Sequence, residues 1–405
     1  MPTNNRRFSS LDSIRGVAAA VVLAYHLFMA FPQSASDYQP QSLLLAAFKL
    51  WPLRLLWAGH EAVLVFFVLS GFVLAMPFLG KAPGYRAFAL RRLLRLYPPC
   101  LAALLLSAGL LTGLSTYQLE GASQHFNETW WFQPVSPSAL LGNVLLDGAS
   151  WHQYIDTPLW SLVHEIRISL VFPLLFLLAA RLPAWAALLA AASFSLAASF
   201  LVSLVPGDLQ HLVLFTALDT ARFVVYFAIG IVIAIHREAI VARIEGWRAS
   251  GMVVVALVGL VLMGSSNRLP YDLGDMLVGA GFALLLCLVL ASRRACAALE
   301  RPPLLWLGKI SYSLYLVHLS VLLSLFYGLG SLLPLSAVIL LVPPASIFAA
   351  WVFWWAVEQP SLAWSRRAER IVAKWDARRQ PALLLESADL PALGLMPEPA
   401  RSSLD

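Results

Sequence analysis

Long apolar runs recur along almost the whole of this chain, and they constrain its fold more than any other feature. Most are roughly 17 to 25 residues long, which is the length of α-helix that crosses the hydrocarbon core of a bilayer. The runs lie at 13–31, 61–79, 96–114, 159–180, 184–205, 214–235, 251–265, 274–292, 305–327 and 335–357. This pattern predicts an all-α polytopic membrane protein with about ten transmembrane helices.

The composition is also that of a membrane protein. Hydrophobic residues make up 60% of the chain and charged residues only 12%, whereas a soluble domain carries roughly a quarter charged residues. This excludes a single soluble core and leaves no stretch for a second, soluble domain. The three cysteines, Cys100, Cys287 and Cys296, fit neither a disulfide framework nor a metal site, so we expect no metal.

Basic residues gather on one side of the predicted helices. The connections after the second, fourth, sixth and eighth runs and the segment after the last are rich in Arg and Lys, whereas the opposite side has only Lys49, Arg54 and Arg268. Because basic loops stay in the cytoplasm, we expect both termini there and two large loops, 32–60 and 115–158, outside. The net charge of +6 therefore reflects orientation in the membrane, and we expect no nucleic-acid partner.

The two ends of the chain differ in composition. Arg6 and Arg7 precede an apolar run, as in a secretory signal peptide. This run contains three polar side chains for which a cleaved segment has no use, so we expect a retained helix. Beyond about Arg379 the chain is rich in Pro, Ala, Leu and Ser, which is typical of disorder. We therefore expect a membrane domain over 1–360 and a basic, then disordered, cytoplasmic tail over 361–405.

Asp12, Arg15 and His26 lie in or beside the first apolar run, and each is costly inside a membrane. Arg15 and His26 are eleven residues apart, so a helix carries them on one face with a rise of about 16 Å between them. The residues between them on that face are small or apolar: Ala18, Ala19 and Val22. An imidazole within a span indicates a functional group, whereas a helix cap or an ion pair with Arg15 explains Asp12 equally well.

Arginines cluster where the third run begins. Arg92 and Arg95 are at i and i+3 on one helical face and lead directly into the run. Two guanidinium groups in this arrangement suit a phosphate, but positive-inside anchoring explains the same residues. The spacing alone leaves both interpretations open.

A polar stripe opens the fourth run. Ser161, Glu165 and Ser169 recur at every fourth residue, and His164 lies beside Glu165. A glutamate within a span faces a cavity or a partner, and it is suited to orient an imidazole as the acid of a Ser-His-Asp site does. Arg167 lies about 200° away round the helix, so we expect it outside this site.

A second polar stripe, of Ser311, Tyr315 and His318, opens the ninth run. It is consistent with a site inside the membrane and equally with interfacial anchors. Asp219 and Arg222, at i and i+3 in the sixth run, are explained most simply by a mutual ion pair.

The outer loop 115–158 mixes aromatic side chains and histidines with carboxylates. Its aromatic and imidazole groups include Trp130, Trp131, Trp151 and His152. Such a surface suits a sugar, but an aromatic belt at the membrane interface has the same composition, so both interpretations stay open.

Several stretches together resemble the integral-membrane acyltransferase family three, the bacterial O-acyltransferases of surface polysaccharides and related glycans. They are RFSSLDSIRGVAAAVVLAYH (7–26), FFVLSGFVL (66–74), RRLLRLYP (91–98), PLWSLVHEIRISL (158–170), ISYSLYLVH (310–318) and the closing Glu358 with Pro360. They follow the family's order over roughly residues 6–360. The resemblance implies a ten-helix fold in the bacterial inner membrane, a donor that is acyl-CoA and usually acetyl-CoA, and a sugar hydroxyl as acceptor, for example in lipopolysaccharide or exopolysaccharide.

The resemblance also assigns roles to individual residues. The family's arginine and histidine of the first span fall on Arg15 and His26, its arginine pair falls on Arg92 and Arg95, and its glutamate falls on Glu165.

This chain departs from the family at two places. The acidic residue that often precedes the Phe-Phe-Val-Leu-Ser-Gly-Phe stretch is Leu64 here, with Glu61 one turn earlier, and the frequent Phe-Tyr after the glutamate is Ile168-Ser169. The role of the second span and the presence of an aromatic wall beside Glu165 therefore stay open.

These observations combine into one hypothesis. Arg15, Arg92 and Arg95 hold the phosphates of CoA, the donor's arm follows the small-residue face of the first span, and His26 acts as general base or acyl carrier with Glu165 orienting its ring. Further candidates are Asp12, Glu61, Ser161, His164, Tyr315 and His318.

Two other classes compete with this hypothesis. One is a secondary transporter of a small solute, for which the chain lacks a matching pair of Gly/Pro-broken spans, and the other is a non-catalytic scaffold or receptor. The sequence leaves open the glycan acceptor, the acyl chain, the oligomeric state, and direct transfer as against an acyl-histidine intermediate.

Overall fold

The computed structural model describes residues 9–30, 47–80, 82–115, 119, 122–148, 154–206, 213–265 and 269–388. All the regular elements in these residues are helices, and nine helical stretches are long and apolar enough to cross a membrane. The prediction of an all-α polytopic membrane protein is therefore confirmed. The long helices are α1 (Ser9–Met29), α3 (Gly59–Ala75) with η3 (Met76–Leu79), α4 (Tyr85–Leu114), α7 (Leu159–Arg181), α8 (Ala184–Ser203), α9 (Val213–Ala221) with α10 (Val224–Glu245), α12 (Tyr271–Ala291), α15 (Ser311–Leu329), α16 (Leu335–Phe353) and α17 (Gln359–Ala388).

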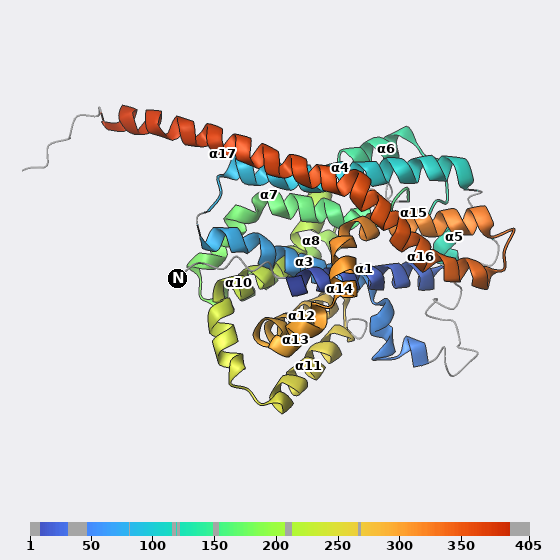
Figure 1. Ribbon diagram of the computed structural model, residues 1–405, viewed down its shortest axis with the longest axis horizontal. Coiled ribbons are helices and arrows are strands. Elements are labelled where there is room, and N and C mark those ends of the chain that lie inside the picture. Colours follow the sequence, from blue (N-terminus) through green and yellow to red (C-terminus); the bar gives the residue numbers. More distant parts are fainter. Residues whose placement is uncertain are drawn as a thin grey trace, which may run out of the picture.

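Each of the ten predicted runs coincides with helix. The run at 251–265 forms α11 (Ala249–Met263), whose 15 residues are fewer than a full span requires. Short helices fill the connections, namely η2 (Leu53–Trp57), α5 (Gln124–Thr129), α6 (Pro137–Val144), α13 (Arg293–Leu299) and α14 (Pro302–Lys309). In Figure 1, α5 lies at one end of the bundle and the far end of α17 extends from the opposite end. The expected cytoplasmic location of both termini stays a prediction.

The helices differ in how deeply they are buried. α3 and α15 are buried on most of their residues and α10 on half of them, whereas α8 and α11 expose leucine, valine and phenylalanine side chains. A helix that is apolar all round is stable only in a core or in lipid. The buried helices therefore form the centre of the bundle, and the others are suited to contact the bilayer.

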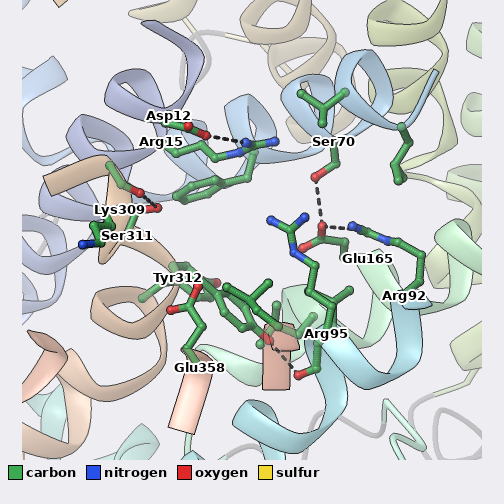
Figure 2. A pocket seen from close by; sticks show the side chains of 18 of the residues that line it. Asp12, Arg15, Ser70, Arg92, Arg95, Glu165, Lys309, Ser311, Tyr312 and Glu358 are labelled. Carbon is green, nitrogen blue, oxygen red and sulfur yellow. Dashed lines mark hydrogen bonds and ion pairs between the residues drawn. The ribbon is translucent and has the colours of Figure 1, made fainter. Parts of the chain in front are cut away.

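Direct backbone contact holds α1 against α14. A methyl group added at Gly16 would lie 2.6 Å from the backbone nitrogen of Gly308, and one added at Gly308 would clash with the carbonyl oxygen of Asp12. Only glycine permits this approach, as at other close helix crossings in membranes. The contact brings Asp12 and Arg15 beside Lys309, at the end of α14 (Figure 2).

The basic segment after the last span forms α17, which packs along α4 (Figure 1). Arg91 of α4 donates to both carboxylate oxygens of Glu369 at 3.0 Å, and the Arg86 guanidinium lies 5.8 Å from the ring centre of Trp375. The bounds of α17 pass Arg379, the residue beyond which we expect disorder. Residues 389–405 lie outside the described residues, so the disorder stays a prediction there.

A short π-helix (Trp354–Glu358), η7, joins α16 to α17. A π-helical turn shifts the register of the side chains that follow it and is frequent at functional sites. Here its last residue, Glu358, is buried and accepts a hydrogen bond from Ser313 at 2.6 Å.

Candidate active site

A cavity of about 320 Å³ lies where α1, α4, α14, α15 and α17 meet α3 and α7. This volume is at the lower end of small-molecule sites, which measure roughly 300–1,000 Å³. Figure 2 shows its charged side chains arriving from several helices that are far apart in the sequence. The lining contains five cationic side chains and three carboxylates: Arg15, Arg92, Arg95, Lys309 and Arg366, and Asp12, Glu165 and Glu358.

The cavity has an exposed end and a buried end. Lys309 and Arg366 are exposed, whereas Ser161 and Tyr315 retain only 4% and 5% of their accessible surface. The hydroxyl groups of Ser161 and Tyr315 are 2.7 Å apart, and the Tyr315 hydroxyl also donates to the carbonyl oxygen of Pro158 at 3.1 Å. The cavity therefore runs from a cationic mouth to an inner end lined by this tyrosine.

Glu165 is fixed inside the cavity by two donors. Its Oε1 accepts from the Ser70 hydroxyl at 2.9 Å and from Arg92 at 3.1 Å (Figure 2). Arg92 donates in turn to Ser169 at 3.1 Å. Ser169 is thus the hydrogen-bond acceptor that α7 offers to Arg92 beside Glu165. The Nε of Arg92 is buried and has no partner among the described residues.

Three of the five cations lack a carboxylate partner. Among the residues that the structure describes, Arg95, Lys309 and Arg366 form no ion pair, while Arg15 pairs with Asp12 at 3.3 Å. The Lys309 ammonium lies 4.0 Å from the ring centre of Trp354. Arg95 is partly buried, where positive charge is costly unless an anion balances it, whereas Lys309 and Arg366 are exposed and offer their charge at the mouth. This end of the cavity is therefore suited to an anionic ligand such as a phosphate.

His26 does not line the cavity but lies beyond its inner end. The ring of Tyr315 is 6.1 Å from that of His318, and Nε2 of His318 is 3.1 Å from Nδ1 of His26. On the other side of His26, the Trp130 ring lies 5.3 Å away between ring centres. His26 thus lies between the cavity and the segment that carries α5.

Two details of the sequence hypothesis need correction. Glu165 does not contact His26, because α7 directs this carboxylate to α4 and α3, whereas α1 directs His26 to α15. The small-residue face of α1 is also not a wall of the cavity. Ala18, Ala19 and Val22 are buried in helix packing, and the cavity follows α3 instead.

His164 and Glu61 lie outside the cavity. His164 is 3.0 Å from the Thr220 hydroxyl through Nδ1 and 3.4 Å from Asp219 through Nε2. Glu61 pairs with Arg54 at 2.5 Å. The predicted pair of Asp219 with Arg222 is present at 2.9 Å, so these charged groups stabilise the packing beside the site.

The described residues of the loop 115–158 also pack against the helices. Arg167 lies outside the cavity, as expected, and donates to the carbonyl oxygens of Leu146 and Asp147 at 2.8 and 2.9 Å. Trp130 and Trp131 are fully buried, so neither offers a free ring face to a sugar. Trp151 and His152, the other members of the predicted aromatic surface, lie outside the described residues.

Asp156 is the one described carboxylic acid that is buried with both oxygens unpartnered. It precedes α7, outside the predicted span, and burial raises the pKa of this carboxyl well above its usual range. Burial therefore favours the neutral form of this carboxyl group.

Sequence reasoning grouped Arg15, Arg92 and Arg95, which all line the cavity, but it placed Glu165 beside His26 and missed other cavity residues. Ser70, Lys309 and Arg366 also line the site. The two cations resemble ordinary positive-inside residues, and Ser70 lies in an apolar stretch, so no local pattern distinguishes them. No group of three or more His, Cys, Asp or Glu side chains suited to a metal ion is found in the described residues.

Comparison with known proteins gives two similarities. A sequence model described as an acyltransferase domain matches residues 8–357. The chain is also similar to acyltransferase MdmB of Streptomyces mycarofaciens, with 29% identity over 336 residues that cover 80% of this chain and 81% of that protein. No solved structure matches the chain. The matched residues contain all of the cavity lining except that supplied by Glu358 and α17.

Proposed function

Because the chain belongs to the acyltransferase family whose sequence model it matches, we propose that it is a membrane O-acyltransferase that uses acyl-CoA. The expected acyl group is acetyl, and the expected acceptor is a hydroxyl group of a sugar in a surface polysaccharide or glycolipid. The observation that carries the proposal is the cavity whose mouth has cations without carboxylate partners and whose inner end adjoins two imidazoles.

The mouth of the cavity suits the phosphates of CoA. Arg95, Lys309 and Arg366 offer positive charge that no described carboxylate neutralises, and guanidinium groups bind phosphate oxygens in pairs of hydrogen bonds. These side chains belong to the ends of α4, α14 and α17 that the charge pattern assigns to the cytoplasm, where acyl-CoA is made. We therefore propose that the donor enters from the cytoplasm.

The interior suits the flexible arm of the donor. From the mouth the cavity passes the apolar side chains of Val63, Phe66 and Phe67 on α3 and ends at Tyr315. An extended arm in this channel directs the thioester toward the pair formed by His318 and His26.

His26 is the proposed base or acyl carrier. As a base it takes the proton of the acceptor hydroxyl while the oxygen attacks the thioester carbonyl carbon; the carbon–sulfur bond breaks, and the leaving thiolate takes the proton to give CoA. As a carrier its nitrogen attacks first, releases CoA and then gives the acyl group to the hydroxyl. The first route requires both substrates together, and the second predicts ping-pong kinetics.

Glu165 has a different proposed role from the one that its sequence position suggested. Its contacts with Ser70 and Arg92 hold the Arg92 guanidinium at the cavity wall. Glu165 thus acts on donor binding through Arg92 and does not orient the imidazole of His26.

The experiment that tests the function uses host membranes with [¹⁴C]acetyl-CoA. The protein should transfer label to the polysaccharide fraction, and Arg95→Gln should raise the acetyl-CoA concentration required. Solute flux into liposomes without acetyl-CoA, combined with no label transfer, would favour the transporter and overturn the proposal.

A further inference from the structure

The contact between His26 and His318 determines where hydrogens lie on both rings. Nδ1 of His318 is 3.0 Å from the carbonyl oxygen of Leu314 and 2.9 Å from that of Tyr315. A carbonyl oxygen only accepts hydrogen bonds, so this nitrogen carries the hydrogen. In a neutral imidazole the other nitrogen then has a lone pair, so Nε2 of His318 is an acceptor.

The same reasoning applies to His26. Its Nδ1 is 2.9 Å from the carbonyl oxygen of Val22 and 3.1 Å from Nε2 of His318. Both neighbours are acceptors, so Nδ1 of His26 carries the hydrogen and its Nε2 has the lone pair. Within the described residues, that Nε2 has no hydrogen-bond partner.

The surroundings hold this arrangement in place. His318 retains none of its accessible surface and His26 only 8%. The Tyr315 hydroxyl is occupied by Ser161 and Pro158, and Glu165 is occupied by Ser70 and Arg92. His26 therefore has two acceptors for this hydrogen, the backbone carbonyl of Val22 in its own helix and His318, and His318 is the side chain that orients the ring from another helix.

We propose that His318 is a positioning residue, which accepts a hydrogen bond from Nδ1 of His26 and so presents Nε2 of His26 as the nitrogen used in acyl transfer. The inference rests on the proposed role of His26. When Nε2 takes a proton or an acyl group, the ring becomes positive and the bond from Nδ1 to His318 becomes charge-assisted, hence stronger. His318 thus stabilises the charged state more than the neutral one, which is the requirement for an effect on rate.

The test compares His318→Gln with His318→Met. Both side chains are similar in length, but only glutamine places a good acceptor near the position of the lost Nε2. In purified protein reconstituted with host glycan, His318→Met should lower kcat for acetyl transfer roughly 10- to 150-fold, the range of a hydrogen bond to a charged group. The KM for acetyl-CoA should stay unchanged, and His318→Gln should recover a large part of kcat.

Equal kcat values for the two folded variants, as a packing role predicts, would overturn the inference. His26→Ala distinguishes the proposed role of His26 from that of His318, because transfer at the wild-type rate in this variant refutes the role of His26 itself. A loss in His26→Ala combined with equal Gln and Met variants refutes only the role of His318.

A second measurement is made on the unaltered protein, and a variant serves only to assign its signals. ¹⁵N NMR of histidine-labelled protein distinguishes the two tautomers, and the signals of His26 are assigned by their loss in His26→Gln. We expect a protonated Nδ1 and an unprotonated Nε2 on His26. The opposite tautomer would contradict the inference.

Discussion

Arg95→Gln is expected to weaken donor use without damaging the fold. Arg95 lines the cavity and forms no ion pair with the described carboxylates, so its loss breaks no direct ion pair within the described part of the protein. By contrast, Arg92 is bound to Glu165 and Ser169, and its removal would disturb the protein itself. Arg95 is therefore the residue that most cleanly separates phosphate binding from stability.

The size of the effect follows from the bond that is lost. A hydrogen bond to a charged group contributes about 1.5–3 kcal/mol. Each 1.4 kcal/mol is tenfold in affinity, so the KM for acetyl-CoA should rise roughly 10- to 150-fold. Because the phosphates lie far from the thioester and are bound equally before and during transfer, kcat should change little.

The assay measures initial rates of CoA release against donor concentration in purified protein with host glycan. Acetyl-pantetheine, which has the reactive arm without the phosphates, is the matched donor, and Arg243→Gln, an exposed cation outside the cavity, is the matched variant. Arg95→Gln should reduce the preference for acetyl-CoA over acetyl-pantetheine, and Arg243→Gln should not. An unchanged preference in Arg95→Gln would refute the reasoning.

Three further substitutions have expected outcomes in thermal unfolding. Arg92→Met leaves the Glu165 carboxylate without its ion-pair partner and should cost about 3 kcal/mol of stability. A double variant that also contains Glu165→Met should recover most of the lost Tm. Equal Tm values for the single and double variants would contradict this. Gly16→Ala pushes α1 away from α14, so it should lower the Tm and raise the KM for acetyl-CoA. Gly109→Ala is the control and should do neither, because its added methyl group meets no atom within 4 Å. Similar effects of the two substitutions would refute the packing argument. Asp156→Asn should raise the Tm at neutral pH, and this gain should vanish toward about pH 4. Burial raises the pKa of the Asp156 carboxyl well above its usual range in the folded protein. As pH rises above about 4, the unfolded chain releases this proton more readily than the folded protein, which favours unfolding of the wild type but not of the variant. A gain that is independent of pH would show that the charge plays no part.

Most of the fold can be predicted from the sequence, because the length and position of each membrane-spanning helix follow from the length and position of its apolar run. A bilayer-spanning helix needs a continuous apolar run, so the ten runs coincide with helices in the structure. Contacts within one helix can also be predicted from the sequence, as the ion pair of Asp219 with Arg222 shows. Spacing along one helix fixes which side chains share a face.

Contacts between helices could not be predicted in this way. Arg92 and Glu165 are 73 residues apart, and His26 and His318 are 292 residues apart. Which faces meet depends on how the helices pack, and here that depends on close backbone contacts such as the one between Gly16 and Gly308. The sequence therefore indicated His26 as functional but assigned it the wrong neighbour.

The central claim is that His26 performs acyl transfer with a donor held in the cationic cavity. The most direct measurement compares wild type and His26→Ala in parallel for acetyl-CoA binding and for transfer of the acetyl group to host glycan. The account predicts unchanged binding, because His26 does not line the cavity, and a loss of transfer of roughly 10²- to 10⁴-fold, the usual contribution of a positioned base. Transfer at the wild-type rate in His26→Ala would contradict it.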